Sequence, residues 1–136
     1  NVYCRGGGSD MDKSVVSTKQ APGAIGPYSQ GIKGNVFVFV SGQLPVDPAA
    51  GEFAAGGIEA QTRQSLQNVQ AILAAAGTTL DQVVKTTVFL QHMTDFAAMN
   101  RVYAEVFAKE CPARSCFEVA KLPKDALVEI EVIALA

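Results

Sequence analysis

The segment Val36 to Val40 constrains the fold of this chain more than any other, because all five residues are apolar and β-branched or aromatic. Such residues favour a β-strand. A strand with one solvated face alternates apolar and polar residues, whereas a strand covered on both faces does not. We therefore predict that residues 35–43 form a strand buried on both sides.

Periodic apolar residues predict two helices. The first has a stripe at helical spacing followed by Gly77, a residue typical of a left-handed C-terminal cap. The stripe consists of Ile58, Thr62, Leu66, Val69, Leu73 and Ala76. The second helix is predicted to start after Asp95 as its N-cap and to be closed by Pro112. Its inward residues are Phe96, Met99, Tyr103 and Val106.

Further strands are predicted near residues 15–18, 83–90, 113–119 and 127–135, with an irregular Pro/Gly-containing loop at 21–29 and a turn at 45–48. This order of elements predicts an α+β fold, with a mixed sheet and two helices on one face. In the last strand both sides are largely apolar, with Leu127, Ile133 and Leu135 on one and Val128 and Ile130 on the other. Two helices cover only one sheet face, so we predict a homo-oligomer packed sheet to sheet.

Composition narrows the function classes. The chain has 136 residues and a formal net charge of −2, which disfavours nucleic acid as the main partner. No apolar stretch approaches the roughly 20 residues that cross a bilayer, so we expect no membrane partner and a cytoplasmic location, with an organelle as the alternative. Residues 1–10 are interpreted as a tag or flexible lead and residues 11–136 as one domain.

Cysteine and histidine are scarce. Cys4, Cys111 and Cys116 form an odd set without metal-type spacing, which favours a reducing compartment. The single histidine, His92, cannot build a site that needs two or three imidazoles, and we interpret it as a surface or capping residue. No metal site is predicted.

Three charged residues stand inside otherwise apolar β-type sequence. Glu129 and Glu131 lie in the last predicted strand. On a face that packs against another chain each carboxylate loses water, which raises its pKa toward that of a general base unless a cation or hydrogen-bond donor compensates. The alternative is that one or both lie at a rim and stay solvated. Arg114 starts the preceding strand, so its guanidinium is able to bind a ligand carboxylate with two hydrogen bonds. The alternative is a structural ion pair with a Glu.

Four smaller or aromatic residues are further candidates for a site. Cys116 shares a strand face with Arg114 and is interpreted as a small apolar residue rather than a nucleophile, since no His is placed to activate it. Ser41 offers a hydroxyl beside Gly42, which allows close backbone approach to a ligand, or is an ordinary strand-end residue. Tyr28 either lines a cleft or anchors its loop on the core.

Several motifs together resemble the RidA (YjgF) family of enamine/imine deaminases over residues 14–136. They are GPYSQ at 26–30, VSGQ at 40–43, QSLQN at 64–68, KTTVFL at 85–90, and PARS at 112–115 followed by EIE at 129–131. The resemblance implies a chorismate-mutase-like subunit in a homotrimer, with the sheets facing inward and three clefts between subunits. One departure is Cys111, where many members have an aromatic residue, in a segment 109–112 that is shorter than usual.

The resemblance also implies an activity without metal or cofactor. Members hydrolyse 2-aminoacrylate, 2-iminopropanoate and 2-iminobutanoate, released by pyridoxal-phosphate dehydratases, to 2-oxo acids and ammonia. Carried over to this chain, Arg114 binds the substrate carboxylate, Glu129 positions or deprotonates water, and Cys116 contributes backbone contacts. Tyr28, Ser41 and Gly42 line the cleft.

Two rival functions remain at this point. A non-catalytic member of the same family would bind a small carboxylate or a partner protein in the same cleft. A ribonuclease or RNA-binding role is opposed by the acidic charge balance.

Overall fold

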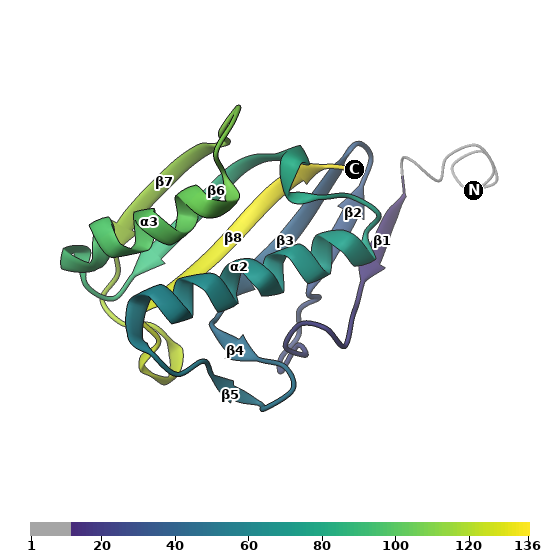
Figure 1. The fold of residues 1–136 in the computed structure, drawn as a ribbon. Coiled ribbons are helices and arrows are strands. Elements are labelled where there is room, and N and C mark those ends of the chain that lie inside the picture. Colours follow the sequence, from purple (N-terminus) through teal and green to yellow (C-terminus); the bar gives the residue numbers. More distant parts are fainter. Residues whose placement is uncertain (1–11) are drawn as a thin grey trace.

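The computed structural model describes residues 12–136, so the interpretation of residues 1–10 as a lead and the cysteine at position 4 lie outside the described residues. The main sheet has the strand order β1-β2-β3-β8-β6-β7 (Figure 1). Its strands are β1 (Lys13–Val16), β2 (Gly31–Gly34), β3 (Phe37–Gln43), β6 (Val83–Leu90), β7 (Ala113–Glu118) and β8 (Val128–Leu135). The β6–β7 pair is parallel and the other pairs are antiparallel, so the sheet is mixed.

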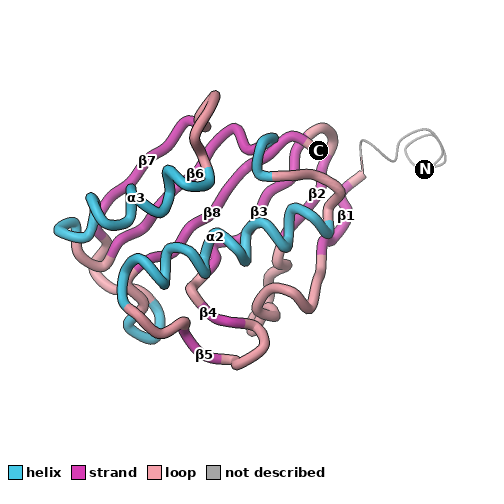
Figure 2. Tube along the Cα trace, viewed as in Figure 1, coloured by secondary structure: helices cyan, strands magenta, loops and turns pink. Residues whose placement is uncertain are grey.

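Two α-helices cover one face of this sheet, as Figure 1 shows, which confirms the predicted fold class. They are α2 (Gly57–Ala75) and α3 (Phe96–Val106). A small hairpin of β4 (Val46–Asp47) and β5 (Glu52–Phe53) precedes α2, and single 3₁₀ turns occur at Leu80–Gln82, Met93–Asp95 and Pro123–Asp125 (Figure 2). The predicted turn at 45–48 is therefore the start of a hairpin.

The core lies between the helices and one face of the sheet. In β8 every second residue, from Val128 to Ala134, is fully or almost fully buried, and Val38 and Val40 of β3 lie on the same side. Leu66, Val69, Ile72 and Leu73 of α2 pack against them. The stripe predicted for the first helix is therefore the contact between this helix and the sheet.

The C-terminal end of α2 shows why its boundary follows from the sequence. Gly77 has a φ of 87°, a left-handed conformation that glycine adopts at little cost. The Gly77 N–H donates to the carbonyl of Ala74 and the Thr78 N–H to that of Leu73, each at 3.0 Å. These two bonds form a Schellman motif and satisfy carbonyls that the helix leaves free.

Several predicted boundaries were wrong. The strand predicted at 35–43 starts at Phe37, because Asn35, with a φ of 55°, forms the turn between β2 and β3. The first strand covers 13–16 rather than 15–18, since the Thr18 N–H donates to Gln30 Oε1 at 2.7 Å instead of pairing in the sheet. Helix α3 ends at Val106, well before Pro112, and the side chain of Asp95 makes no capping hydrogen bond at its start.

The face of the sheet away from the helices is open within one chain. Its exposed apolar residues include Val15, Phe37, Phe39, Phe117 and Leu135. Among residues 12–136, Figure 1 shows no helix or strand covering this side of the sheet. The expectation that β3 is buried on both faces therefore requires a second copy, which stays a prediction.

Gly31 provides a test of the packing of α2 on the sheet. A Cβ at this position would lie 2.9 Å from Cγ2 of Ile72 and 3.2 Å from the carbonyl oxygen of Phe39. We expect Gly31→Ala to lower the free energy of unfolding by about 1–3 kcal/mol through overpacking. Gly34→Ala in the same strand is the matched control, because a Cβ there meets no atom within 4 Å. Urea denaturation measures both, and equal midpoints would show that α2 does not press on β2 as described.

Candidate functional site

Strand register places Arg114 and Glu129 on opposite faces of the sheet. Arg114 of β7 pairs with Thr86 of β6, which in turn pairs with Val132 of β8 on the buried, helix-covered side. Glu129 of β8 pairs with Phe89 of β6 and lies one position out of step with these residues, on the open face. Because side chains of paired residues point to the same side, the two groups do not meet within one chain.

The first half of the candidate site surrounds Arg114, which is half-buried. Its guanidinium carbon lies 4.6 Å from the ring centroid of Tyr103 and 5.4 Å from that of Phe96, both within the range of cation–π contacts. Its Nη1 donates to Oδ1 of Asn100 at 2.6 Å. No ion pair to Arg114 is found among residues 12–136, so the alternative of a structural pair with a Glu in the same chain is wrong.

Cys116 shares the face of Arg114, as predicted, since it pairs with Val88 two positions further along β6. It packs against the core, and burial raises the pKa of its thiol while the nearby Arg114 charge lowers it. A raised thiol pKa leaves little thiolate at neutral pH. The interpretation of Cys116 as a small apolar residue rather than a nucleophile therefore agrees with its surroundings.

The second half of the candidate site surrounds Glu129 on the open face. The register of β3 against β8 shifts between Val40 and Gln43, so Ser41 and Gly42 form a bulge beside Glu129. A Cβ at position 42 would collide with the carboxylate of Glu129. Glycine is thus required here for the carboxylate to lie against the β3 backbone.

The environment of Glu129 changes its acidity. Burial raises the pKa of its carboxyl group, and the negative charge of Glu131 raises it further. Within one chain Glu131 is exposed and Glu129 is half-buried, and the position of either residue relative to the rim of an interface stays a prediction. A carboxylate with a raised pKa is a stronger base toward a water proton.

Ser41 and Tyr28 have roles that differ from the simplest expectation. The Ser41 hydroxyl donates to the carbonyl of Ser29 at 2.6 Å, and the Ser41 N–H donates to the carbonyl of Gln30 at 2.9 Å. Ser41 therefore holds the loop that carries Tyr28, and its hydroxyl oxygen keeps only acceptor capacity for a ligand. Tyr28 is 50% exposed, and its hydroxyl accepts a bond from the Ile25 N–H at 3.4 Å, so it does not anchor the loop in the core.

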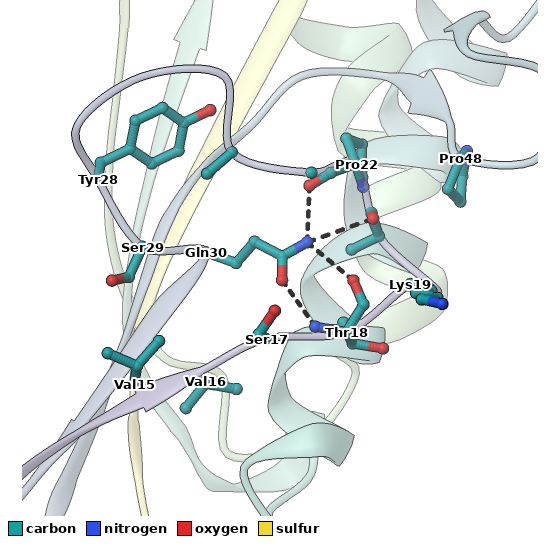
Figure 3. A pocket seen from close by; sticks show the side chains of 13 residues that line it. Val15, Val16, Ser17, Thr18, Lys19, Pro22, Tyr28, Ser29, Gln30 and Pro48 are labelled. Atoms are coloured by element: carbon teal, nitrogen blue, oxygen red, sulfur yellow. Dashed lines mark hydrogen bonds between the residues drawn. The ribbon is translucent and has the colours of Figure 1, made fainter.

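The side chain of Gln30 holds this loop in place through hydrogen bonds to its backbone. Its Nε2 donates to the carbonyls of Thr18, Ala21 and Pro22, and its Oε1 accepts the Thr18 N–H (Figure 3). Gln30 is only 5% exposed, and both polar ends of its amide are satisfied by backbone. The cleft drawn in Figure 3, of about 700 Å³, lies beside this network and contains neither Arg114 nor Glu129.

A smaller hollow lies beside Gly42, the residue whose backbone lies against the Glu129 carboxylate. It has a volume of about 300 Å³ and is lined by Tyr28 and Gly42 together with apolar residues such as Ile25, Leu44 and Val46. Its size and mainly apolar lining suit a small organic molecule. Tyr28 and Gly42 thus line one hollow, whose lining does not include Glu129, although the Glu129 carboxylate lies against Gly42. Arg114 and Cys116 lie together on the other face of the sheet.

Sequence reasoning missed two residues of this arrangement, Asn100 and Gln30. Asn100 lies in the predicted second helix at a spacing that puts it on the same face as the apolar residues Phe96 and Tyr103, and asparagine is an unfavourable helix former. The place of this asparagine in the helix was the one signal in the sequence that it has a role, but the sequence does not tell which side chain it contacts.

Residues 12–136 offer neither a metal-binding cluster nor a membrane-spanning helix. No cluster of three or more His, Cys, Asp or Glu side chains there could hold a metal ion. In the same part of the chain, no helix is both long and apolar enough to cross a membrane.

The fold places this chain in a class with many solved structures. E. coli TdcF with bound serine superposes with a TM-score of 0.86 at 47% identity, covering 90% of this chain and 98% of TdcF. The sequence pattern of the endoribonuclease L-PSP family matches residues 18–136. The chain belongs to this family, and its resemblance to RidA proteins is confirmed by curated relatives.

Two curated relatives of this chain carry different names, one for a deaminase activity and one for a family only. The 2-iminobutanoate/2-iminopropanoate deaminase of Salmonella typhimurium is 50% identical over 128 residues, covering 92% of this chain and 98% of the relative. A RutC family protein of Pyrococcus horikoshii is 56% identical over 122 residues, covering 90% and 97%. Curated relatives named as deaminases support enzyme activity at the level of the family.

The pKa of Glu129 predicts how stability depends on pH. Because the folded state raises this pKa above its ordinary value near 4.5, folding binds protons in the window above that value and stability falls as pH rises through it. Glu129→Gln removes the cost of the buried charge, so we expect it to raise the unfolding temperature at pH 7 and to have little effect at pH 4. Thermal unfolding at both pH values measures this, with Glu52→Gln as an exposed-carboxylate control. A variant less stable than wild type at pH 7 would contradict it.

Proposed function

We propose that this protein hydrolyses small 2-imino acids and their enamine tautomers, such as 2-aminoacrylate, 2-iminopropanoate and 2-iminobutanoate, to 2-oxo acids and ammonia. The observation that carries the proposal is the Arg114 guanidinium, which is held by Asn100 and two aromatic rings and has no ion pair among the described residues. A fixed and uncompensated guanidinium is suited to a ligand carboxylate.

The chemistry needs few groups. A protonated imine carbon is electrophilic, so hydrolysis requires orientation of the substrate and a base for the attacking water. Arg114 would bind the substrate carboxylate. Glu129 would take a proton from a water molecule as the oxygen of that water bonds to the imine carbon. Glu129 would return this proton to the nitrogen of the resulting carbinolamine and then take the proton of its hydroxyl group, so that the C–N bond breaks, the carbonyl forms and ammonia leaves.

Arg114 and Glu129 would meet across an interface between two copies of the chain. The open face of the sheet carries Glu129 together with the apolar residues Phe39 and Phe117. Such a face is suited to packing against another copy. In the proposed homotrimer, with sheets facing inward, Arg114 and Cys116 of one subunit would complete a cleft with Tyr28, Ser41, Gly42 and Glu129 of its neighbour.

The comparisons support this choice of substrate. The TdcF structure was solved with bound serine, an amino acid with a carboxylate, and the Salmonella relative is named for 2-iminobutanoate and 2-iminopropanoate. Pyridoxal-phosphate dehydratases release such imines, so we propose a functional link to them and a cytoplasmic location. We propose that no cofactor takes part.

Arg114→Lys tests the carboxylate clamp. Lysine keeps the positive charge but loses the planar pair of donors, so we expect a loss of activity of about tenfold or more. The measurement is release of 2-oxo acid in an assay coupled to a threonine dehydratase, with Arg114→Ala beside it. Arg101→Lys, at an exposed position of α3, is the matched control.

The same assay separates the rival function. An enzyme accelerates release of the 2-oxo acid over the uncatalysed rate, whereas a non-catalytic carboxylate-binding protein leaves that rate unchanged. Equal rates for wild type and Arg114→Ala would remove the proposed role of this residue.

A further inference from the structure

We propose that Asn100 is a positioning and selectivity residue for Arg114: its neutral amide orients the guanidinium without neutralising it, which keeps the charge available for a ligand carboxylate. The inference rests on the proposed function, because it concerns the same carboxylate. It assigns a role to a residue that touches Arg114 rather than to one that touches the substrate.

The hydrogen bond defines the orientation of both groups. A guanidinium has five N–H donors and no acceptor, so the amide of Asn100 must present its oxygen. The bond from Nη1 to Oδ1 is 2.6 Å long, short even for a bond from a charged donor. It uses one donor of Nη1, and no hydrogen bond from Nε or Nη2 is found in residues 12–136. The edge formed by Nε and Nη2 therefore keeps the pair of donors that a carboxylate binds.

The three side chains that contact the Arg114 guanidinium all come from helix α3. Phe96, Asn100 and Tyr103 are spaced at i, i+4 and i+7, which places them on one face of the helix. Tyr103 is fixed in turn, since its hydroxyl lies 2.8 Å from Oγ1 of buried Thr86. Two rings and one amide thus restrict the guanidinium, and none of the three carries a formal charge.

The carboxylates of the neighbouring helix surfaces are directed elsewhere. Glu105 of α3 pairs with Arg63 at 3.1 Å, and Glu59 of α2 pairs with Arg101 at 3.0 Å. Arg101 follows Asn100 directly in the chain and has a carboxylate partner, whereas Arg114 has an amide. This contrast shows that ion pairs form readily on the same helix and that position 100 is where a carboxylate would neutralise Arg114.

The consequence is a selectivity for anionic ligands. An aspartate at position 100 has the size of asparagine and would form a charge-assisted bond to Nη1. It would compete for the guanidinium with the ligand and place a like charge near the ligand carboxylate. Asparagine keeps the geometry of that bond and avoids the repulsion.

The test compares Asn100→Asp and Asn100→Ala with wild type. The probe is pyruvate, a 2-oxo carboxylate, titrated by calorimetry and used as an inhibitor of the coupled assay, with its neutral amide as the second probe. We expect Asn100→Asp to weaken pyruvate binding by about tenfold or more and to leave binding of the amide unchanged. Asn100→Ala should weaken pyruvate binding by only about threefold, because the charge of Arg114 is kept.

Arg101→Gln is the matched control, since it changes the net charge by the same amount on the adjacent residue of the same helix. It should bind pyruvate like wild type. Thermal unfolding checks that each variant is folded. If the Asp variant does not fold, Asn100→Ala decides: KM for the imine should rise with kcat nearly kept, and an unchanged KM overturns the proposal.

The failure of this inference is distinguishable from that of the proposed function. If Arg114→Ala loses pyruvate binding while Asn100→Asp binds it like wild type, the role of Asn100 is wrong and the carboxylate clamp stands. If Arg114→Ala binds and turns over like wild type, the proposed function of Arg114 is wrong as well. Equal losses for pyruvate and its amide in Asn100→Asp would indicate a structural defect and also overturn the selectivity.

Discussion

The alternation of side chains along a pleated sheet is the constraint on which the rest of this molecule depends. It directs Arg114 of β7 toward α3 and Glu129 of β8 toward the open face, although only strand β6 lies between their two strands. No rotamer change carries a side chain through a sheet whose strands are hydrogen-bonded. A site that uses both groups must therefore be built from two copies of the chain.

Stability and function are linked on the open face. The same surface exposes phenylalanines of β3 and β7 and holds the carboxylate of Glu129, whose pKa is already raised by burial in one chain. Covering this face would stabilise the assembly through its apolar area and remove more water from Glu129. One packing event would thus provide both the association and a stronger base. On the other face, helix α3 holds Arg114 with uncharged groups, so the two halves are prepared separately.

Much of the fold could be predicted from the sequence, because periodic apolar residues report the elements directly. The helix ending at Gly77 and the strand at 83–90 were placed to within a residue. Strand β2 was missed, since Gly31 and Gly34 give no strand signal and its place is fixed by pairing with β3. Arg114, Glu129 and Cys116 were found as candidates from charge and alternation, but which face each occupies depends on the register between β6, β7 and β8. Asn100 was missed because its contact depends on how α3 is rotated over β7.

The central claim is that the working site is shared between subunits, and subunit mixing tests it most directly. Arg114→Ala and Glu129→Gln chains, each expected to be inactive alone, would be co-expressed at equal levels and purified together. Random assembly gives about a quarter of the interfaces both intact residues, so about a quarter of wild-type activity should return. A mixture no more active than the two variants alone would contradict a site formed between copies of this chain.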